Sequence, residues 1–364
     1  MRRGNRTLLA LLAAGALALP LAARAEEVKI DSDTFGGLEA RSIGPAAMSG
    51  RITAVDALEG ERLTIYVGSA SGGVWKSVDG GLAFKPIFDK HTQSIGAVTI
   101  DRKNPKTVWV GTGESCTRNS VSVGDGVYKT TDGGETWQTM GLAESERITK
   151  IVIDPDHSDT VFVCATGHAF DRYPERGVFR TTDGGKTWEK TLFVDADTGC
   201  SDIAIDPQDG RILYAGMWQF RRQPWFFTSG GPGSGLFKST DGGTTWRKIT
   251  KGLAEGELGR IAIAVSPVRP SVVYTTVEAR QTALYRSDDL GETWARMNTS
   301  SAVTGRPFYF SHLVADPRNW NRIYRPAFSL SVSDDGGKTL STVGGGGLMG
   351  PALQRSEVPR VTSV

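Results

Sequence analysis

The sequence predicts an all-β protein, a β-propeller of about six four-stranded blades. Three observations predict this fold: one motif recurs six times, its copies are about 50 residues apart, and short alternating apolar segments fill the intervals. Repeats of this length are typical of solenoids and propellers, and four short antiparallel strands per repeat make a propeller blade. Two alternatives stay open, a complete ring and an open ring from a truncated longer protein.

The repeated motif is S/T-x-D-x-G-x-T-W. Its copies are SVDGGLAF (Ser77–Phe84), TTDGGETW (Thr130–Trp137), TTDGGKTW (Thr181–Trp188), STDGGTTW (Ser239–Trp246), SDDLGETW (Ser287–Trp294) and SDDGGKTL (Ser333–Leu340). Asp and Ser/Thr side chains can bond the backbone of their own turn, Gly adopts dihedral angles that other residues avoid, and Trp packs between sheets. We therefore expect each motif to form the turn between the third and fourth strands of a blade.

Each repeat also carries strand signals before the motif. An apolar run that ends in Asp or Asp-Pro comes first, as in AVTID (Ala97–Asp101), and a second run such as TVWVG (107–111) follows it. A third run, such as GVYKT (Gly126–Thr130), leads directly into the motif, and the residues after the motif form the fourth strand. Since no amphipathic helix pattern interrupts this order, the blades should be purely β.

Both ends of the chain depart from the repeat. Residues 1–25 combine early arginines, an apolar run and a final Ala-Arg-Ala, which predicts a signal peptide and a periplasmic or secreted protein. The sixth motif ends in Leu340 instead of Trp, and residues 344–364 lack strand periodicity, which predicts an irregular tail and suggests a truncated longer protein. Residues 26–343 are left for the propeller.

Composition argues against several partners. The 42 Lys and Arg residues nearly balance the 40 Asp and Glu residues, and loss of the signal peptide turns the net charge from +2 to about −2. This balance disfavours nucleic acid and anionic membrane surfaces, and we expect no membrane insertion after signal cleavage. No Cys or His spacing indicates a metal, and we expect no cofactor. Cys164 and Cys200 lie near predicted strand ends on one face, so the sequence leaves open whether they form a disulfide.

The motif is similar to the BNR or Asp-box repeat, which sialidases, xyloglucanase-type glycoside hydrolases and sortilin-like propellers share. The stretches RSIGPAAMSGRI (Arg41–Ile52), GSASGGVWKSVDGG (68–81) and GGPGSGLFKSTDGG (230–243) resemble exported bacterial proteins described as sortilin-like or glycosyl-hydrolase-like. The resemblance covers about residues 35–347. It implies the fold strongly and the activity weakly, because one fold carries many functions.

The loops between the second and third strands carry the candidate site. They rise on the face opposite the Asp boxes, and they are longest in the second, third and fourth repeats (111–126, 165–177 and 216–235), so we expect them to converge. Glycoside hydrolysis needs two carboxyl groups across a cleft. The candidate catalytic carboxylates are Glu114, Asp125, Asp171 and Asp202. The candidate ligand-binding residues are Arg51, Arg118, His168, Arg172, Trp218, Arg221, Trp225 and His312, since arginines clamp carboxylates and aromatic rings stack on sugars or cover peptides.

Three classes of function compete. The family resemblance favours a glycosyl-hydrolase-like protein directed at a polysaccharide. The alternatives are a sortilin-like peptide- or protein-binding propeller without catalysis and a structural module of the cell envelope. A sialidase needs an arginine triad, and Arg51, Arg147 and Arg260 do begin inner strands in alternate blades, but the RIP signature of sialidases is missing.

Overall fold

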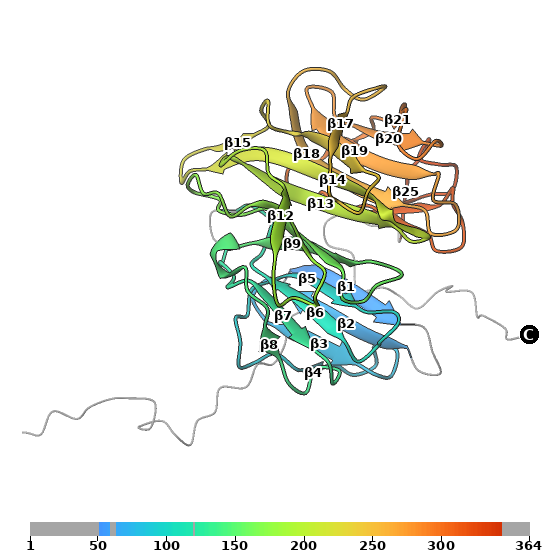
Figure 1. Cartoon of the computed structure of the whole chain (residues 1–364). Helices are drawn as coiled ribbons and strands as arrows, with labels where there is room; N and C mark the ends of the chain where they lie inside the picture. Colours follow the sequence, from blue (N-terminus) through green and yellow to red (C-terminus); the bar gives the residue numbers. More distant parts are fainter. Residues whose placement is uncertain (1–50, 59–62, 119–120, 344–364) are drawn as a thin grey trace, which may run out of the picture. The chain divides into compact units, whose positions relative to one another are not determined.

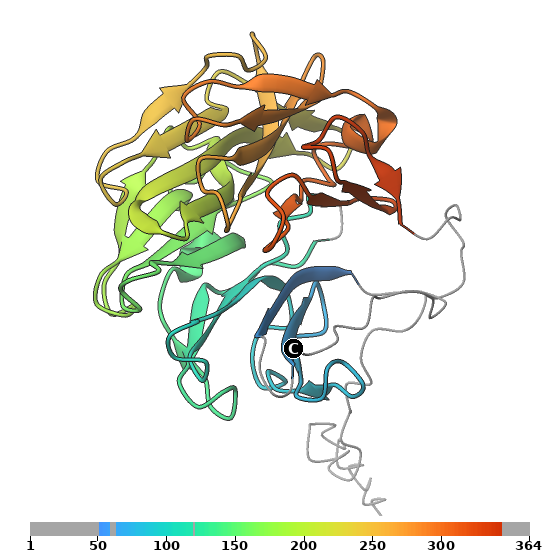
Figure 2. The same ribbon diagram turned by 90° about the vertical axis from the view of Figure 1, so that its right-hand side faces the viewer.

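Six antiparallel sheets make up the part of the chain that the computed structural model describes, residues 51–58, 63–118 and 121–343. Each sheet corresponds to one sequence repeat, and its four main strands lie in chain order from the inside outward. Figure 2 shows the six blades following one another around a common axis. The prediction of a six-bladed, all-β propeller is confirmed.

Most strands are short, and they are numbered along the chain. In the first three blades they are β1 (Ile52–Leu58), β2 (Thr64–Ser69), β3 (Val74–Ser77), β4 (Lys85–Pro86), β5 (Ile95–Ile100), β6 (Val108–Thr112), β7 (Val127–Thr130), β8 (Gln138–Thr139), β9 (Ile148–Ile153), β10 (Val161–Ala165), β11 (Gly177–Thr181) and β12 (Glu189–Leu192). In the last three blades they are β13 (Thr198–Asp206), β14 (Asp209–Arg222), β15 (Phe227–Ser229), β16 (Gly235–Ser239), β17 (Arg247–Ile249), β18 (Leu258–Val265), β19 (Val273–Ala279), β20 (Ala283–Ser287), β21 (Ala295–Asn298), β22 (Val314–Ala315), β23 (Ile323–Pro326), β24 (Leu330–Ser333) and β25 (Ser341–Thr342). The described helical turns are η2 (Ala143–Ser145) and α1 (Ser301–Thr304), so strands dominate the described fold (Figure 1).

The Asp boxes form the turns between the third and fourth strands, as predicted. In the third blade, Asp183 accepts hydrogen bonds from the hydroxyl groups of Thr181 and Thr187, both at 2.7 Å, and from the backbone N–H of Thr187 at 3.0 Å. Gly184 and Gly185 have positive φ angles of 72° and 98°, which glycine adopts without a steric penalty. Each turn therefore satisfies its own carboxylate, and this local chemistry explains why the motif recurs.

Apolar side chains fill the junctions between consecutive blades. At the first junction, Tyr66 and Val74 of blade one pack with Ile95 and Val108 of blade two. Corresponding clusters of buried residues lie at the following four junctions. Full burial of such a side chain stabilises a fold by about 1.5–3 kcal/mol, so the stability of the propeller resides mainly between the blades.

A cation at the end of each third strand also joins consecutive blades. This inter-blade cation immediately precedes the box Ser or Thr, and it is Lys76, Lys129, Arg180, Lys238 or Arg286 in the first five blades. The first four donate a hydrogen bond to the backbone carbonyl of the next box turn, at Gly133, Gly184, Gly242 and Leu290, over 2.6–3.1 Å. Arg286 instead donates to the Asn321 side chain at 2.8 Å. In blade six the same position is Val332, which cannot make this bond.

Blades one and six have more exposed apolar faces than their neighbours. On β1, Ile52 and Val55 are 48% and 61% exposed, whereas the inner strand β18 is buried over nearly all its length. In blade six, Val314, Phe328 and Leu330 are also exposed. The first and last described blades thus expose apolar side chains that the strands beside them do not cover.

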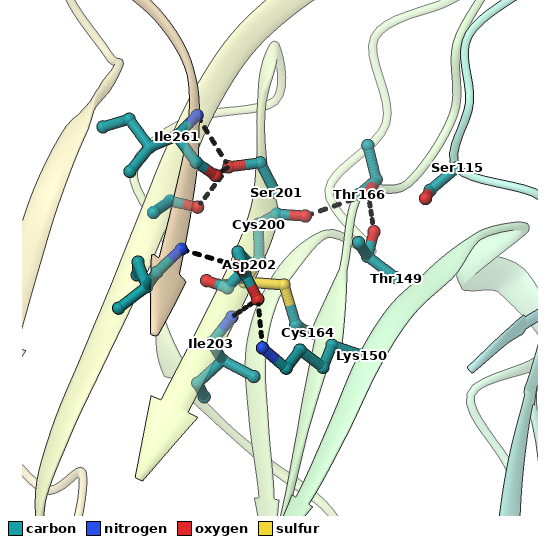
Figure 3. The surroundings of a disulfide bond; sticks show 12 residues. Ser115, Thr149, Lys150, Cys164, Thr166, Cys200, Ser201, Asp202, Ile203 and Ile261 are labelled. Carbon is teal, nitrogen blue, oxygen red and sulfur yellow. Dashed lines mark hydrogen bonds and ion pairs between the residues drawn. A yellow bond between two sulfur atoms is a disulfide. The ribbon is translucent and has the colours of Figure 1, made fainter. Parts of the chain in front are cut away.

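A disulfide between Cys164 and Cys200 joins blade three to blade four (Figure 3). Cys164 lies on β10 and Cys200 on β13, their Cα atoms are 5.1 Å apart, and both residues are fully buried. The sequence left this pairing open, and the structure settles it. Closing a loop over a separation of 36 residues stabilises a fold by about 4 kcal/mol in the chain-entropy account.

Two sequence predictions fall outside the described residues, the signal peptide at residues 1–25 and the irregular tail at residues 344–364. In the portion that the structure does describe, no helix is long and apolar enough to span a membrane.

Candidate functional site

The loop of blade two crosses toward the axis and binds residues of other blades. The carboxylate of Glu114, which is fully buried, accepts hydrogen bonds from Arg51 Nε at 2.6 Å and from Arg51 Nη2 at 2.5 Å. The next residue, Ser115, contacts the buried guanidinium of Arg260 through its carbonyl oxygen at 3.3 Å. The loop is therefore held against blades one and five, and the Glu114 carboxylate makes the contact with blade one.

Asp202 and His312 line a cavity of about 580 Å³ along the inner strands. Asp202 is 6% exposed and accepts hydrogen bonds from Lys150 Nζ at 2.7 Å and from the backbone N–H of Ile263 at 2.8 Å, so it links blades three, four and five (Figure 3). His312 is partly exposed, and burial, reinforced by the positive charge of Arg260, lowers its pKa to about 4. At neutral pH the cavity therefore contains a neutral imidazole.

The two other candidate carboxylates are exposed and differ in their partners. Asp125 accepts hydrogen bonds from the hydroxyl groups of Thr112 at 3.1 Å and Tyr128 at 2.7 Å, which fix the base of its loop. Among the described contacts, the Asp171 carboxylate binds a neighbour in its own loop, His168 Nδ1, at 2.8 Å. The His168 ring stacks on Tyr173 with centroids 4.1 Å apart. The Asp171 side chain is 61% exposed and is therefore accessible to a ligand.

Two predicted arginines meet on a carboxylate that the sequence did not single out. Arg172 of blade three and Arg221 of blade four both bind Asp197, the former at 3.0 Å. Asp197 precedes β13 and is partly exposed. The two ion pairs join the loops of blades three and four, and Arg172 keeps 71% of its side chain exposed.

A hairpin of blade four carries two exposed aromatic residues at its tip. Strand β14 runs on past the blade and pairs with the short strand β15, and the hairpin projects beyond the other strands in Figure 1. Trp225 and Phe226 lie at its tip, 78% and 48% exposed. Trp218 lies in the same strand but is fully buried beneath Arg260, whose guanidinium is 5.0 Å from its ring centroid. A ligand can therefore reach Trp225 and Phe226, while Trp218 belongs to the interior.

The structure brings the predicted residues together in two groups. His168, Asp171, Arg172, Arg221 and Trp225 belong to the surface loops of blades three and four, whereas Arg51, Glu114, Asp202 and His312 lie near the axis. Arg118 follows the buried loop of blade two and is partly exposed. Asp197 and Phe226 extend the surface group; Phe226 was recognisable by its place beside Trp225, and Asp197 was not, because its partners come from other loops.

No metal ligand set is evident among the residues that the structure describes: none of them form a group of three or more His, Cys, Asp or Glu side chains able to hold an ion.

Comparison with known proteins agrees with this architecture. Residues 179–190, which include the third box, match the BNR/Asp-box repeat family. The chain is a six-bladed β-propeller, and the matched segment contains one of the six copies of its repeated motif.

Within that class the chain resembles xyloglucanase-type proteins. It is 28% identical over 215 residues to Xyloglucanase Xgh74A of Acetivibrio thermocellus, a match that covers 50% of this chain and 23% of the relative. An ancestral GH74 enzyme of known structure superposes with a TM-score of 0.59 at 20% identity, over 78% of this chain and 36% of that one. The structure of YCF48 bound to D1 peptide superposes with a TM-score of 0.50 at 17% identity, over 80% and 82% of the two chains. The chain therefore spans about a quarter of the length of the xyloglucanase that it matches.

Proposed function

We propose that this propeller is directed at a polysaccharide and that its surface loops on blades three and four form the binding face. The observation that carries the proposal is the aromatic hairpin tip, where Trp225 and Phe226 are exposed on the loop face. Exposed apolar side chains that lie next to each other often mark a ligand-binding surface, and flat aromatic faces suit the apolar faces of sugar rings.

Polar groups beside the tip fit the same ligand class. Arg172 and Arg221 are held by Asp197, and the exposed Asp171 lies in the same loop as Arg172. Such pre-oriented donors and acceptors can bind sugar hydroxyl groups without ordering a loop first, which reduces the entropic cost of binding. The sequence similarity to a xyloglucanase supports a glycan over the peptide-binding alternative.

The test is binding of the purified chain to immobilised polysaccharides, xyloglucan among them, and to a peptide array. Trp225→Ala should weaken polysaccharide binding by at least about tenfold, as loss of a central aromatic contact does. Phe84→Ala is the matched control, because Phe84 is 40% exposed but lies in an Asp box on the opposite face. Binding to peptides alone, or equal losses for both variants, would refute the proposal.

Export is part of the same proposal, since a polysaccharide ligand lies outside the cytoplasm. Expression of the full chain in a bacterium, followed by fractionation and amino-terminal sequencing, checks it. We expect the mature protein in the periplasm or medium to begin at Glu26. An uncleaved chain in the cytoplasm would contradict export without affecting the binding experiment.

A further inference from the structure

We propose that the polysaccharide bound by the loops of blades three and four carries acidic groups, either carboxylates or sulfate esters, and that Arg172 binds them. The inference rests on the proposed function and narrows its ligand to one chemical class. The residues that carry it are Arg172, Arg176 and Arg221, which we call the arginine cluster. They surround the carboxylate of Asp197.

Two arginines of the cluster share one carboxylate. Arg172 Nε lies 3.0 Å from Asp197 Oδ2, and Arg221 Nη2 binds the other oxygen, Oδ1. A backbone hydrogen bond also joins the two loops, because the N–H of Arg222 donates to the Ala169 carbonyl at 2.8 Å. The guanidinium groups are therefore held in place before a ligand arrives, which reduces the entropic cost of binding.

The outer edge of Arg172 is open to a ligand. Its side chain is 71% exposed, and the atom that contacts Asp197 is Nε. Among the described contacts, none engages its two terminal Nη groups. The N–H groups along that edge point in parallel and match the paired oxygens of a carboxylate or a sulfate group. Asp197 thus orients Arg172 and leaves this edge free to bind an acidic group.

A buried arginine adds positive charge to the base of the same loop. Arg176 is fully buried, and it donates from Nε to the Tyr173 carbonyl at 2.9 Å and from Nη2 to the His168 carbonyl at 2.7 Å. Its Nη1 has no partner among the described residues. Burial, followed by the positive charge of Arg221, lowers the pKa of Arg176 to about 10, so it stays charged at neutral pH. A buried cation beside other cations is unfavourable, and an acidic ligand would offset this cost.

The segments that carry the cluster keep a surplus of positive charge. They contain four arginines and three aspartates, at residues 168–176, 195–197 and 220–222. Their remaining acid, Glu175, pairs with Lys190 at 2.8 Å. One positive charge is therefore left over. Over the whole chain, 42 Lys and Arg residues nearly balance 40 Asp and Glu residues, so attraction of an acidic polymer has to come from a local site such as this one.

Exposed aromatic side chains adjoin the cluster in the sequence. Phe170, two residues before Arg172, is 43% exposed, and the exposed Trp225 follows Arg221 by four residues. Sugar rings can stack on these aromatic side chains while acidic substituents on the rings bind the arginine edge. A neutral polysaccharide would use the aromatic contacts alone, whereas an acidic one uses both kinds of group.

The first experiment compares matched pairs of polymers that differ in charge. Binding of the full chain is measured to polygalacturonate and its carboxyl-reduced form, and to dextran sulfate and dextran. We expect at least one acidic polymer to bind about tenfold or more tightly than its neutral counterpart, because its hydrogen bonds to arginine are charge-assisted. The preferred acidic polymer identifies the group as a carboxylate or a sulfate ester. Added salt should weaken this binding through screening.

The second experiment removes the charge of Arg172. Arg172→Gln should weaken binding of the preferred acidic polymer about tenfold and change the weaker binding of its neutral counterpart by less than about twofold. Arg211→Gln is the matched control, because Arg211 is 76% exposed and pairs with Asp209 at 2.7 Å. Arg211 lies beside the box turn of blade four, where its carbonyl accepts a hydrogen bond from the N–H of Gly242. Both arginines are exposed, so both variants should keep the melting temperature of the unaltered chain.

Two results would overturn the acidic ligand and leave the proposed function standing. One is equal binding of the acidic and the neutral polymers, with the loss on Trp225→Ala retained. The other is an equal effect of Arg172→Gln and Arg211→Gln on the acidic polymer. Absence of binding to any polysaccharide, acidic or neutral, would overturn both.

Discussion

The two faces of the propeller use the same residue types in opposite ways. On the Asp-box face, an aspartate such as Asp183 is satisfied by Thr181 and Thr187 of its own turn. On the loop face and near the axis, carboxylates bind distant residues: Glu114 binds Arg51, 63 positions away, and Asp202 binds Ile263 of the next blade. Local partners can be copied with a repeat, whereas distant partners are unique to one place in the fold.

This difference teaches where function can arise. Because every box satisfies itself, the box face has little capacity for a ligand-specific arrangement. The loop face contains residues that occur once, such as Trp225 and Phe226 at the aromatic tip. Departure from the repeat therefore indicates function better than the repeat itself does.

The largest expected effect separates a structural from a catalytic Glu114. Arg51→Met leaves a fully buried carboxylate without its partner, which should lower the free energy of unfolding by about 3–5 kcal/mol. Glu114→Gln should cost less, because the Arg51 side chain is 29% exposed and can reach water. Urea unfolding measures both, and the double variant Arg51→Met with Glu114→Met should recover most of the loss. Less than about 1 kcal/mol for Arg51→Met would contradict the structural role.

A smaller effect tests how far the box face depends on its neighbours. Lys238 is 4% exposed and donates to the Leu290 carbonyl of the next box turn at 2.6 Å. Lys238→Met should lower the free energy of unfolding by about 2 kcal/mol, the usual value for a hydrogen bond to a charged group. Val332→Met is the matched control, since Val332 occupies the same repeat position in blade six without this bond. Equal costs for the two variants would show that the inter-blade cation contributes nothing.

The smallest expected effect is a difference in the pH at which groups near the axis and groups on the box face lose their contribution to stability. Burial lowers the pKa of His312 to about 4, below its ordinary value near 6.5. The stabilisation from the neutral imidazole is therefore complete above about pH 6.5 and is lost as the pH falls toward 4. On the box face, hydrogen bonds from the hydroxyl and then the N–H of Thr245 lower the pKa of Asp241 to about 2. The stabilisation from the ionised Asp241 is therefore lost only between about pH 4 and 2.

Chemical denaturation across this pH range should therefore show two separate declines in stability. His312→Gln should abolish the first decline and Asp241→Asn should reduce only the second. A first decline that persists in His312→Gln would assign it to another group.

The sequence was sufficient for the fold because the box, the strands and the repeat length are local patterns. It also predicted that the long loops of blades two, three and four converge; Arg172 and Arg221, from blades three and four, both bind Asp197, whereas the loop of blade two binds Arg51 and Arg260 near the axis. It could not separate the exposed Trp225 from the buried Trp218, since both lie in one loop segment and only the path of β14 decides which ring faces water.

The inter-blade cations give each of blades two to five a donor at one side and an acceptor at the other. Lys129, for example, donates a hydrogen bond to the Gly184 carbonyl of the next blade. The Gly133 carbonyl, in the box turn that follows Lys129, accepts a hydrogen bond from Lys76 of the preceding blade. Duplication of such a repeat would duplicate both the donor and the acceptor. A gene that gained or lost one repeat would therefore leave no buried donor without an acceptor. Recombination between repeats can therefore change the number of blades while the loops evolve separately.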